Sequence, residues 1–154
     1  MKKVVLTVVS ILALGVGTCF ASPINNLNKG QTAIGVSDDS FYLEHKISDN
    51  ITLGFQKDDI YGQVNVGNNL RAILGSRDYN SSSQIYIGAA VNTPIAPSLD
   101  GYASLIGAND FAELQVGVNY NLTSNFDVNL NYRSFMPDQG GNSNRTSLGA
   151  TFKF

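Results

Sequence analysis

Apolar and polar residues alternate with a period of two through most of the chain beyond residue 30. Between Ala112 and Tyr120, for example, apolar side chains at even positions are separated by Glu113, Gln115 and other non-apolar residues. A period of two places successive side chains on opposite faces of a β-strand. Helical periodicity is absent after residue 21, so the pattern predicts an all-β protein whose strands have one apolar and one polar face.

Ten segments carry this alternation, and residues that favour turns separate them. Their predicted bounds are 31–37, 40–47, 51–57, 60–66, 70–77, 84–91, 101–107, 111–120, 126–135 and 145–154. An even number of such strands suits a closed antiparallel up-and-down transmembrane β-barrel. Several segments are shorter than the 9–11 residues that a strand needs to cross a bilayer, so eight strands remain the alternative count.

A soluble β-sandwich shows the same alternation, so the period alone does not separate it from a barrel. Aromatic residues gather at the predicted strand ends, as Tyr120, Phe126 and Phe152 show. Transmembrane barrels carry aromatic girdles at these positions. The predicted polar face is also rich in Asn, Gln, Tyr and charged residues, which suits a small hydrated lumen. Both features favour the barrel over the sandwich.

The first 21 residues have the composition of a secretory signal peptide. Lys2 and Lys3 precede an uncharged, mostly apolar run at residues 4–17, and small residues follow at Cys19 and Ala21. A charged head, an apolar core and a small-residue cleavage site define such a signal. The run is short for a membrane helix, which needs about 20 residues. We therefore expect cleavage after Ala21, with acylation at Cys19 as the weaker alternative.

The mature chain would then be one domain, residues 22–154. It would hold no cysteine, because Cys19 is the single cysteine of the sequence. Loss of Lys2 and Lys3 leaves eight basic residues against twelve acidic ones, a net charge of −4. This acidic balance argues against nucleic acid as a partner.

The chain ends in Ser147-Leu148-Gly149-Ala150-Thr151-Phe152-Lys153-Phe154. Outer-membrane barrels end with a polar residue, a Gly two positions on, and alternating aromatics that finish on a terminal Phe, so the matching residues are Ser147, Gly149, Phe152 and Phe154. On this motif and on its architecture the chain resembles small bacterial outer-membrane β-barrels of the OmpX and OmpA-barrel type. The resemblance implies a place in the cell outer membrane, contact with its lipid and lipopolysaccharide, and insertion by the barrel assembly machinery, which reads this terminal signal.

Hairpin registers that keep apolar side chains on one face also pair charges on the other. If Tyr120 faces Phe126, then Glu113 faces Arg133 in the lumen. If Val66 faces Leu70, then Asp59 faces Arg77. Opposite charges directly across two strands stabilise a sheet by about 0.2–1 kcal/mol per pair. We therefore predict two lumen charge pairs, Glu113–Arg133 and Asp59–Arg77.

The same registers set tyrosines against glycines. Tyr61 would face Gly54 on one neighbouring strand and Gly75 on the other, and Tyr42 would face Gly35. A tyrosine ring that covers a glycine stabilises a sheet.

The sequence offers little for catalysis, and it indicates no enzyme, no cofactor and no metal site. The single histidine, His45, falls on the predicted lipid face without catalytic partners. Leu43 and Ile47 stand where omptin-like proteases and lipid A deacylases carry their Asp and Ser. One His with no mature Cys leaves no set of metal ligands.

Most aspartates fall on the predicted outer turns. They are Asp38, Asp39, Asp58, Asp59, Asp78, Asp110 and Asp138. Asp is a good turn former, which explains the placement without a function. Clustered carboxylates also suit hard divalent cations, which would bridge them to the phosphates of lipopolysaccharide.

Three functions follow from these observations. The leading one is an integral outer-membrane barrel with a structural or surface-interaction role, whose lumen is filled by side chains. The second is a narrow passive channel for ions or small solutes. The third is a secreted soluble β-protein that binds a ligand.

Overall fold

The computed structural model describes residues 22–38 and 40–154, and the proposed signal peptide lies outside them. The described part of the chain contains ten strands and no helix. The strands are β1 (Thr32–Ser37), β2 (Phe41–Lys46), β3 (Ile51–Gln56), β4 (Asp59–Gly67), β5 (Leu70–Tyr79), β6 (Ser82–Ala96), β7 (Leu99–Gly107), β8 (Phe111–Thr123), β9 (Phe126–Pro137) and β10 (Ser143–Lys153).

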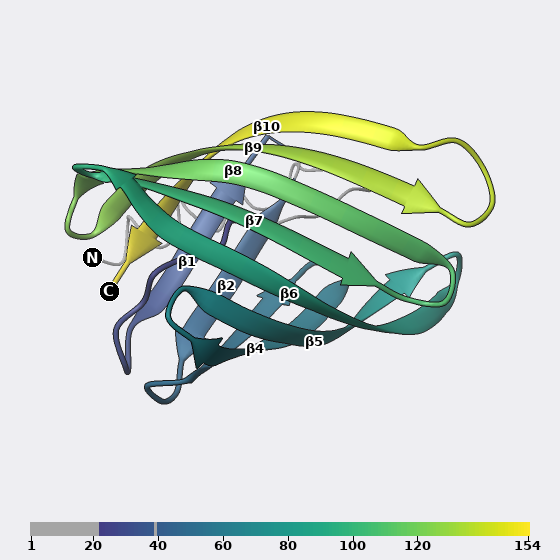
Figure 1. Ribbon diagram of the computed structural model, residues 1–154, viewed down its shortest axis with the longest axis horizontal. Coiled ribbons are helices and arrows are strands. Elements are labelled where there is room, and N and C mark those ends of the chain that lie inside the picture. The colour runs from purple at the N-terminus through teal and green to yellow at the C-terminus, as the bar shows by residue number, and fades with distance from the viewer. Residues whose placement is uncertain (1–21, 39) are drawn as a thin grey trace, which may run out of the picture.

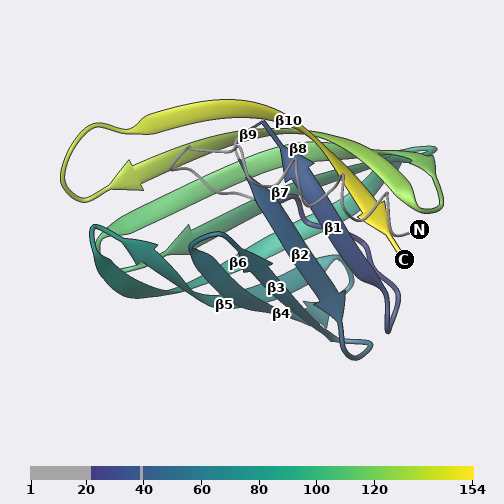
Figure 2. The ribbon, with the colours of Figure 1, turned by 180° about the vertical axis from the view of Figure 1, so that it is seen from behind.

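The ten strands form one closed antiparallel barrel in which each strand pairs with its neighbours in the chain. Closure comes from β1 and β10, which pair from Ala33 opposite Lys153 to Ser37 opposite Gly149. Figures 1 and 2 show this up-and-down arrangement from both sides. The fold prediction is therefore confirmed, with ten strands rather than eight. Across residues 22–38 and 40–154, no helix has the length and apolar character needed to cross a membrane.

The hairpin turns define two rims. We call the distal rim the end that carries the turns around residues 38–40, 57–58, 80–81, 108–110 and 138–142. The terminal rim is the opposite end, where residues 28–31 enter the barrel and Phe154 ends it. Backbone hydrogen bonds join Thr32 and Phe154 in both directions, at 2.8 and 2.9 Å, and so fasten the first strand to the last residue.

The wall of the barrel is apolar outside and polar inside. Large apolar side chains are exposed on every strand from β2 to β10, whereas buried Asn, Gln, Arg, Asp and Glu side chains line the lumen. The predicted face parity holds on the strands other than β7. On β7, where the sequence left the outward face open between Tyr102 and Ile106 and their neighbours, Leu105 points outward while Tyr102 and Ile106 point inward. This distribution is the reverse of a soluble β-sandwich, which buries its apolar face.

Four tyrosines inside the barrel cover glycines on neighbouring strands. Their pairs are Tyr42 with Gly35, Tyr61 with Gly54, Tyr86 with Gly75, and Tyr102 with Gly117. A Cβ added at any of the four glycines would overlap the tyrosine ring. The prediction that Tyr61 covers Gly75 is wrong, although the two residues are opposite in register, because the ring leans over Gly54 and leaves Gly75 to Tyr86.

The outward face gives a stability prediction. Leu130 lies near the middle of β9, and Leu122 lies close to the terminal rim on β8; both side chains are about half exposed. In a bilayer, Leu130→Arg should lower the free energy of unfolding by about 2–4 kcal/mol, and Leu122→Arg by about 0–1 kcal/mol, because the cost of a charge falls toward the interface. Urea titration of protein folded into lipid vesicles measures both. Equal losses would contradict the depth assignment.

Candidate functional site in the barrel lumen

The chain segment that precedes β1 runs inside the lumen. In this N-terminal lumen segment, residues 22–27, all side chains but that of Asn26 are buried. The Ser22 hydroxyl lies 2.7 Å from Tyr61 Oη and accepts a hydrogen bond from Gln56 at 3.2 Å. On the opposite wall, Asn119 donates to the carbonyl oxygen of Ile24 at 3.0 Å. The segment is therefore bonded across the whole width of the barrel.

Asn25 is the most tightly held residue of this segment. Its side-chain amide donates to Glu44 Oε2 at 2.7 Å and to Tyr42 Oη at 3.3 Å. Arg71 donates one hydrogen bond to the Asn25 carbonyl and another to the Asn26 side chain, each at 2.9 Å. Bonds to charged groups are stronger than neutral ones, so Glu44 and Arg71 anchor the segment at its centre.

Glu44 is completely buried, and its place in the sheet explains why it needs an internal partner. Its neighbours in register are Ala33 on β1 and Gly54 on β3, and neither brings a charge or fills the space in front of the carboxylate. Tyr61 and Gln63 donate hydrogen bonds to Oε1 at 2.8 and 2.9 Å, and the Asn25 amide donates to Oε2. A buried charge must be hydrogen-bonded in this way to be tolerated.

Sequence reasoning missed the N-terminal lumen segment. Residues 22–27 have no period-two pattern, so they offered no strand to place. The informative pattern lies at Glu44 instead. An inward acidic residue with small residues opposite it on both neighbouring strands indicates that a chain segment outside the barrel wall fills the lumen in front of it.

A charge network occupies the distal half of the lumen. Arg77 lies opposite Asp59 in register and holds it through Nε and Nη2, both 2.9 Å from Oδ2. Its Nη1 lies 2.8 Å from Glu113 Oε2. Tyr86 donates to the other Asp59 oxygen at 2.8 Å. Arg77 thus bridges two carboxylates that come from opposite sides of the barrel.

The predicted register of the second pair is wrong. Glu113 lies opposite Phe135, and Arg133 lies opposite Gln115, because β8 and β9 continue to a turn at residues 124–125 and, after a β-bulge between Asn121 and Thr123, pair two residues away from the predicted register. The shift of two preserves the face of every side chain. Arg133 is therefore still in the lumen, and its Nη1 lies 3.7 Å from Glu113 Oε2. This contact is longer than the one between Glu113 and Arg77.

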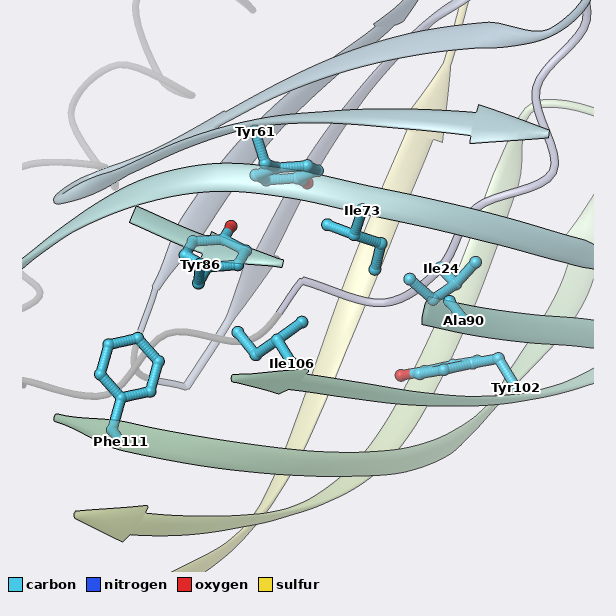
Figure 3. Packing of buried hydrophobic residues seen from close by; sticks show 8 residues of the cluster. All are labelled: Ile24, Tyr61, Ile73, Tyr86, Ala90, Tyr102, Ile106 and Phe111. Carbon is cyan, nitrogen blue, oxygen red and sulfur yellow. The ribbon is translucent and has the colours of Figure 1, made fainter. Parts of the chain in front are cut away.

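Aromatic rings lie beside this network on its distal side. Tyr79, Phe111 and Phe135 pack with ring centroids 5.3–5.6 Å apart. The Arg77 guanidinium lies 5.4 Å from the ring centres of both Phe111 and Tyr86. Figure 3 shows Phe111 and Tyr86 at one end of a row of buried apolar side chains that reaches Ile24 of the N-terminal lumen segment.

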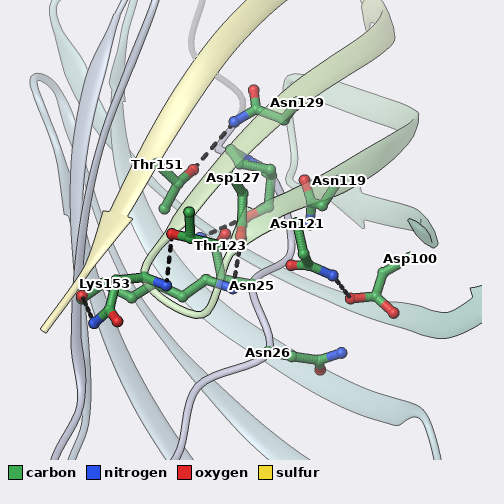
Figure 4. Close-up of polar contacts among 12 residues, drawn as sticks. Asn25, Asn26, Asp100, Asn119, Asn121, Thr123, Asp127, Asn129, Thr151 and Lys153 are labelled. Carbon is green, nitrogen blue, oxygen red and sulfur yellow. Dashed lines mark hydrogen bonds and ion pairs between the residues drawn. The ribbon is translucent and has the colours of Figure 1, made fainter. Parts of the chain in front are cut away.

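Smaller polar contacts line the lumen near the terminal rim. Lys153 forms an ion pair with Asp127, and Asn129 donates to Thr151 Oγ1 at 3.1 Å. Thr151 also bonds Tyr42. Figure 4 shows this group beside Asn25, which indicates that the wall and the N-terminal lumen segment share one hydrogen-bonded interior.

Among the cavities formed by residues 22–38 and 40–154, two lie along the lumen. The inner one, of about 40 Å³, is lined by Ser22, Ile24 and the charge network. The other, of about 180 Å³, lies toward the terminal rim and is lined by Asn26, Lys46 and Arg71 among others. The inner cavity has room for a few water molecules. The N-terminal lumen segment contributes to both cavities, so it lies between them.

Removing the central arginine tests the charge network. Arg77→Met should lower the free energy of unfolding by about 3–5 kcal/mol, because it leaves two buried carboxylates without their cation. The matched control is Arg145→Met, since Arg145 lies 3.7 Å from Asp38 at the surface, with the two side chains 39% and 48% exposed; such a surface pair contributes about 0–1 kcal/mol. Urea titration in lipid vesicles measures the two losses, and similar values would show that the network is hydrated rather than buried.

The four residues of the terminal signal lie on two faces of β10. Phe152 and Phe154 point outward and stack on each other, with centroids 6.0 Å apart. Ser147 points into the lumen and donates to Asn131 at 2.9 Å. Gly149 lies against Val36 and Ser37 of β1, where a Cβ would collide with the backbone. A factor that reads the proposed signal would therefore meet aromatic rings at the terminal rim beside the β1–β10 seam.

The described residues bring together no catalytic constellation around the single histidine. His45 is exposed on the outer face of β2, and its Nδ1 lies 2.9 Å from the hydroxyl of Thr32. Within residues 22–38 and 40–154, no three His, Cys, Asp or Glu side chains are arranged to hold a metal ion. Of the rim aspartates, Asp59 points into the lumen rather than outward, and Asp39 lies outside the described residues.

Comparison with solved structures returns membrane β-barrels at low sequence identity. A de novo designed transmembrane β-barrel is 16% identical, with a TM-score of 0.44, over 83% of this chain and 98% of the design. The N-terminal β-barrel domain of Pseudomonas aeruginosa OprF is also 16% identical, with a TM-score of 0.40, over 82% of this chain and 98% of that domain.

A third similar structure comes from a study of the in-meso crystallization of membrane proteins. It is 12% identical, with a TM-score of 0.47, over 82% of this chain and 83% of the other. No protein-family model and no curated protein matches the chain.

Proposed function

We propose that this chain is an integral outer-membrane β-barrel with a structural or surface-interaction role and a lumen that its own residues keep closed. The observation that carries the proposal is the N-terminal lumen segment, which is hydrogen-bonded to both sides of the barrel. The apolar outer wall supports the membrane location, because soluble proteins rarely expose a continuous apolar surface of this extent.

A non-enzymatic role is supported by what fills the interior. The acidic and basic side chains of the lumen are paired with each other, as in the Asp59–Arg77–Glu113 network, or anchor the N-terminal lumen segment, as Glu44 and Arg71 do. These contacts stabilise the barrel, although Arg71 and Lys46 also line the cavity toward the terminal rim. Contact with lipopolysaccharide through the exposed aspartates of the distal rim belongs to the same proposal.

The experiment that tests the membrane location is cell fractionation combined with gel mobility before and after boiling. We expect the protein in the outer-membrane fraction, with a folded form that migrates differently until it is boiled. Recovery in the soluble periplasm without a mobility shift would favour the secreted ligand-binding alternative.

Planar-bilayer recording of the purified protein separates the structural role from the channel. The proposal expects little or no steady current, because the N-terminal lumen segment and the aromatic cluster close the lumen in series. Large, stable currents from the unmodified protein would favour a passive channel.

A further inference from the structure

The apolar belt on the outside of the barrel differs in height around its circumference. On β10 and β1–β5, which we call the low wall, the outward apolar run covers at most seven residues per strand; examples are 51–55 on β3 and 60–66 on β4. On β6–β9, the high wall, it covers nine to eleven. The run on β8, 112–122, is uninterrupted, whereas 85–95 on β6 contains Thr93 and 126–136 on β9 contains Ser134. Figures 1 and 2 show a contrast between short β1–β3 and long β6, β8 and β9.

These runs convert to heights through the rise of a strand. At about 3.3 Å per residue and a tilt of about 40°, five to seven residues reach about 13–18 Å along the barrel axis. Eleven residues reach about 28 Å by the same conversion. The high wall therefore matches the roughly 30 Å of bilayer hydrocarbon, and the low wall falls short by ten Å or more on this scale.

Polar residues bound the belt of the low wall closely. Asp49 and Lys57 flank the run on β3, and Asp58 and Asn68 flank that on β4. In a flat bilayer these residues would lie in hydrocarbon. Tilting the whole barrel does not remove the conflict, because a wedge-shaped belt has upper and lower edges that are not parallel.

The side chains of the low wall identify what covers it. Leu53, Ile60, Val64 and Leu74 are exposed there in the same way as Ile85 and Leu114 on the high wall. Protein interfaces instead concentrate Tyr, Trp, Phe, Met and Arg inside a polar rim, whereas Phe55, Phe152 and Phe154 of the low wall lie at the ends of their apolar runs. The two walls share one surface chemistry and differ in height, which favours lipid as the occupant of both.

We propose that the bilayer is thinner beside the low wall than beside the high wall, by about 10 Å, so that the barrel creates a local thin patch in its membrane. This inference rests on the proposed membrane location. It adds that the lipid around the barrel is asymmetric.

Single spin labels in dioleoyl phosphatidylcholine vesicles test the inference. The chain holds no cysteine once Cys19 is lost with the leader or changed by Cys19→Ala, so each added cysteine is unique. Labels at Asp58→Cys and Asn68→Cys lie five residues to either side of the middle of the β4 belt. Labels at Ala112→Cys and Leu122→Cys lie five residues from the middle of the β8 belt. The two pairs are therefore matched in the number of residues from the middle of each belt, with Asp58 and Asn68 in the turns that bound β4.

If the bilayer is thinned, a water-soluble nickel chelate should relax the spin labels at Asp58 and Asn68 several-fold more than oxygen does. The spin labels at Ala112 and Leu122 should be relaxed more by oxygen than by the nickel chelate. A flat bilayer would give both pairs the oxygen preference and overturn the inference. A label at Val64→Cys that is shielded from both reagents would also overturn it, because a second copy or another protein would then cover the low wall. A label at Val116→Cys reached by nickel would instead refute the membrane location itself.

Discussion

Steady ionic current is expected only when residues 22–27 are deleted and Phe111 is replaced by Ala in the same chain. The two changes remove barriers that lie in series. The N-terminal lumen segment closes the centre through Ser22, Ile24 and Asn25, and Phe111 packs with Tyr79 beyond the charge network. Either barrier alone suffices to stop ions, so each single change should leave the membrane non-conducting in planar-bilayer recordings.

Asn25→Ala is the matched control for the deletion. It keeps the length of the segment and the backbone carbonyl that Arg71 binds, but removes the hydrogen bonds to Glu44 and Tyr42. Combined with Phe111→Ala, it should weaken the barrel without producing steady current. Current from the deletion alone would show that the aromatic cluster does not close the distal half. Absence of current from the double variant would show that the charge network alone is sufficient to block ions.

Phe154→Asp should leave the protein unassembled and sensitive to protease, with loss of the folded band on unboiled gels. The side chain is exposed at the outer terminal rim and stacks on Phe152, so a carboxylate there removes both the aromatic contact and the proposed signal. Pulse-labelled cells followed by protease treatment of the outer membrane measure assembly.

The control is Phe126→Asp, an outward Phe near the same rim but at the start of β9. If Phe154 acts as a signal, Phe126→Asp should still assemble and lose stability only. Equal failure of both variants would mean that Phe154 matters for its apolar surface and not for its terminal position.

The wall of the barrel was predictable because strand parity carries so much information. A slip of one residue would move every side chain of a strand to the wrong face. The alternation around Leu130 or Val116 therefore assigns inside and outside without knowledge of the turns. Registers are harder, because the alternation is unchanged when two strands pair two residues away from the predicted register, as β8 and β9 do.

The contents of the lumen were less predictable. Asp59 and Arg77 are opposite in register and meet, so pairing rules are enough to find them. Glu113 is held most closely by Arg77, which lies on a strand that is not its neighbour, and no two-strand rule connects them. Asn25 reaches Glu44 from a segment with no pattern at all. Contacts across the barrel depend on its circumference and closure, which single hairpins do not encode.

Closure of the barrel at the β1–β10 seam has a consequence for folding order. Every other pairing joins strands that follow one another in the chain, so those hairpins form from local contacts. The seam joins Thr32 to Phe154. Closing a loop of that length costs about 4 kcal/mol of chain entropy, whereas each hairpin loop costs far less. An open curved sheet with free edges on β1 and β10 should therefore precede the barrel. Such edges recruit other strands, and the interval before closure is when this protein is most exposed to aggregation.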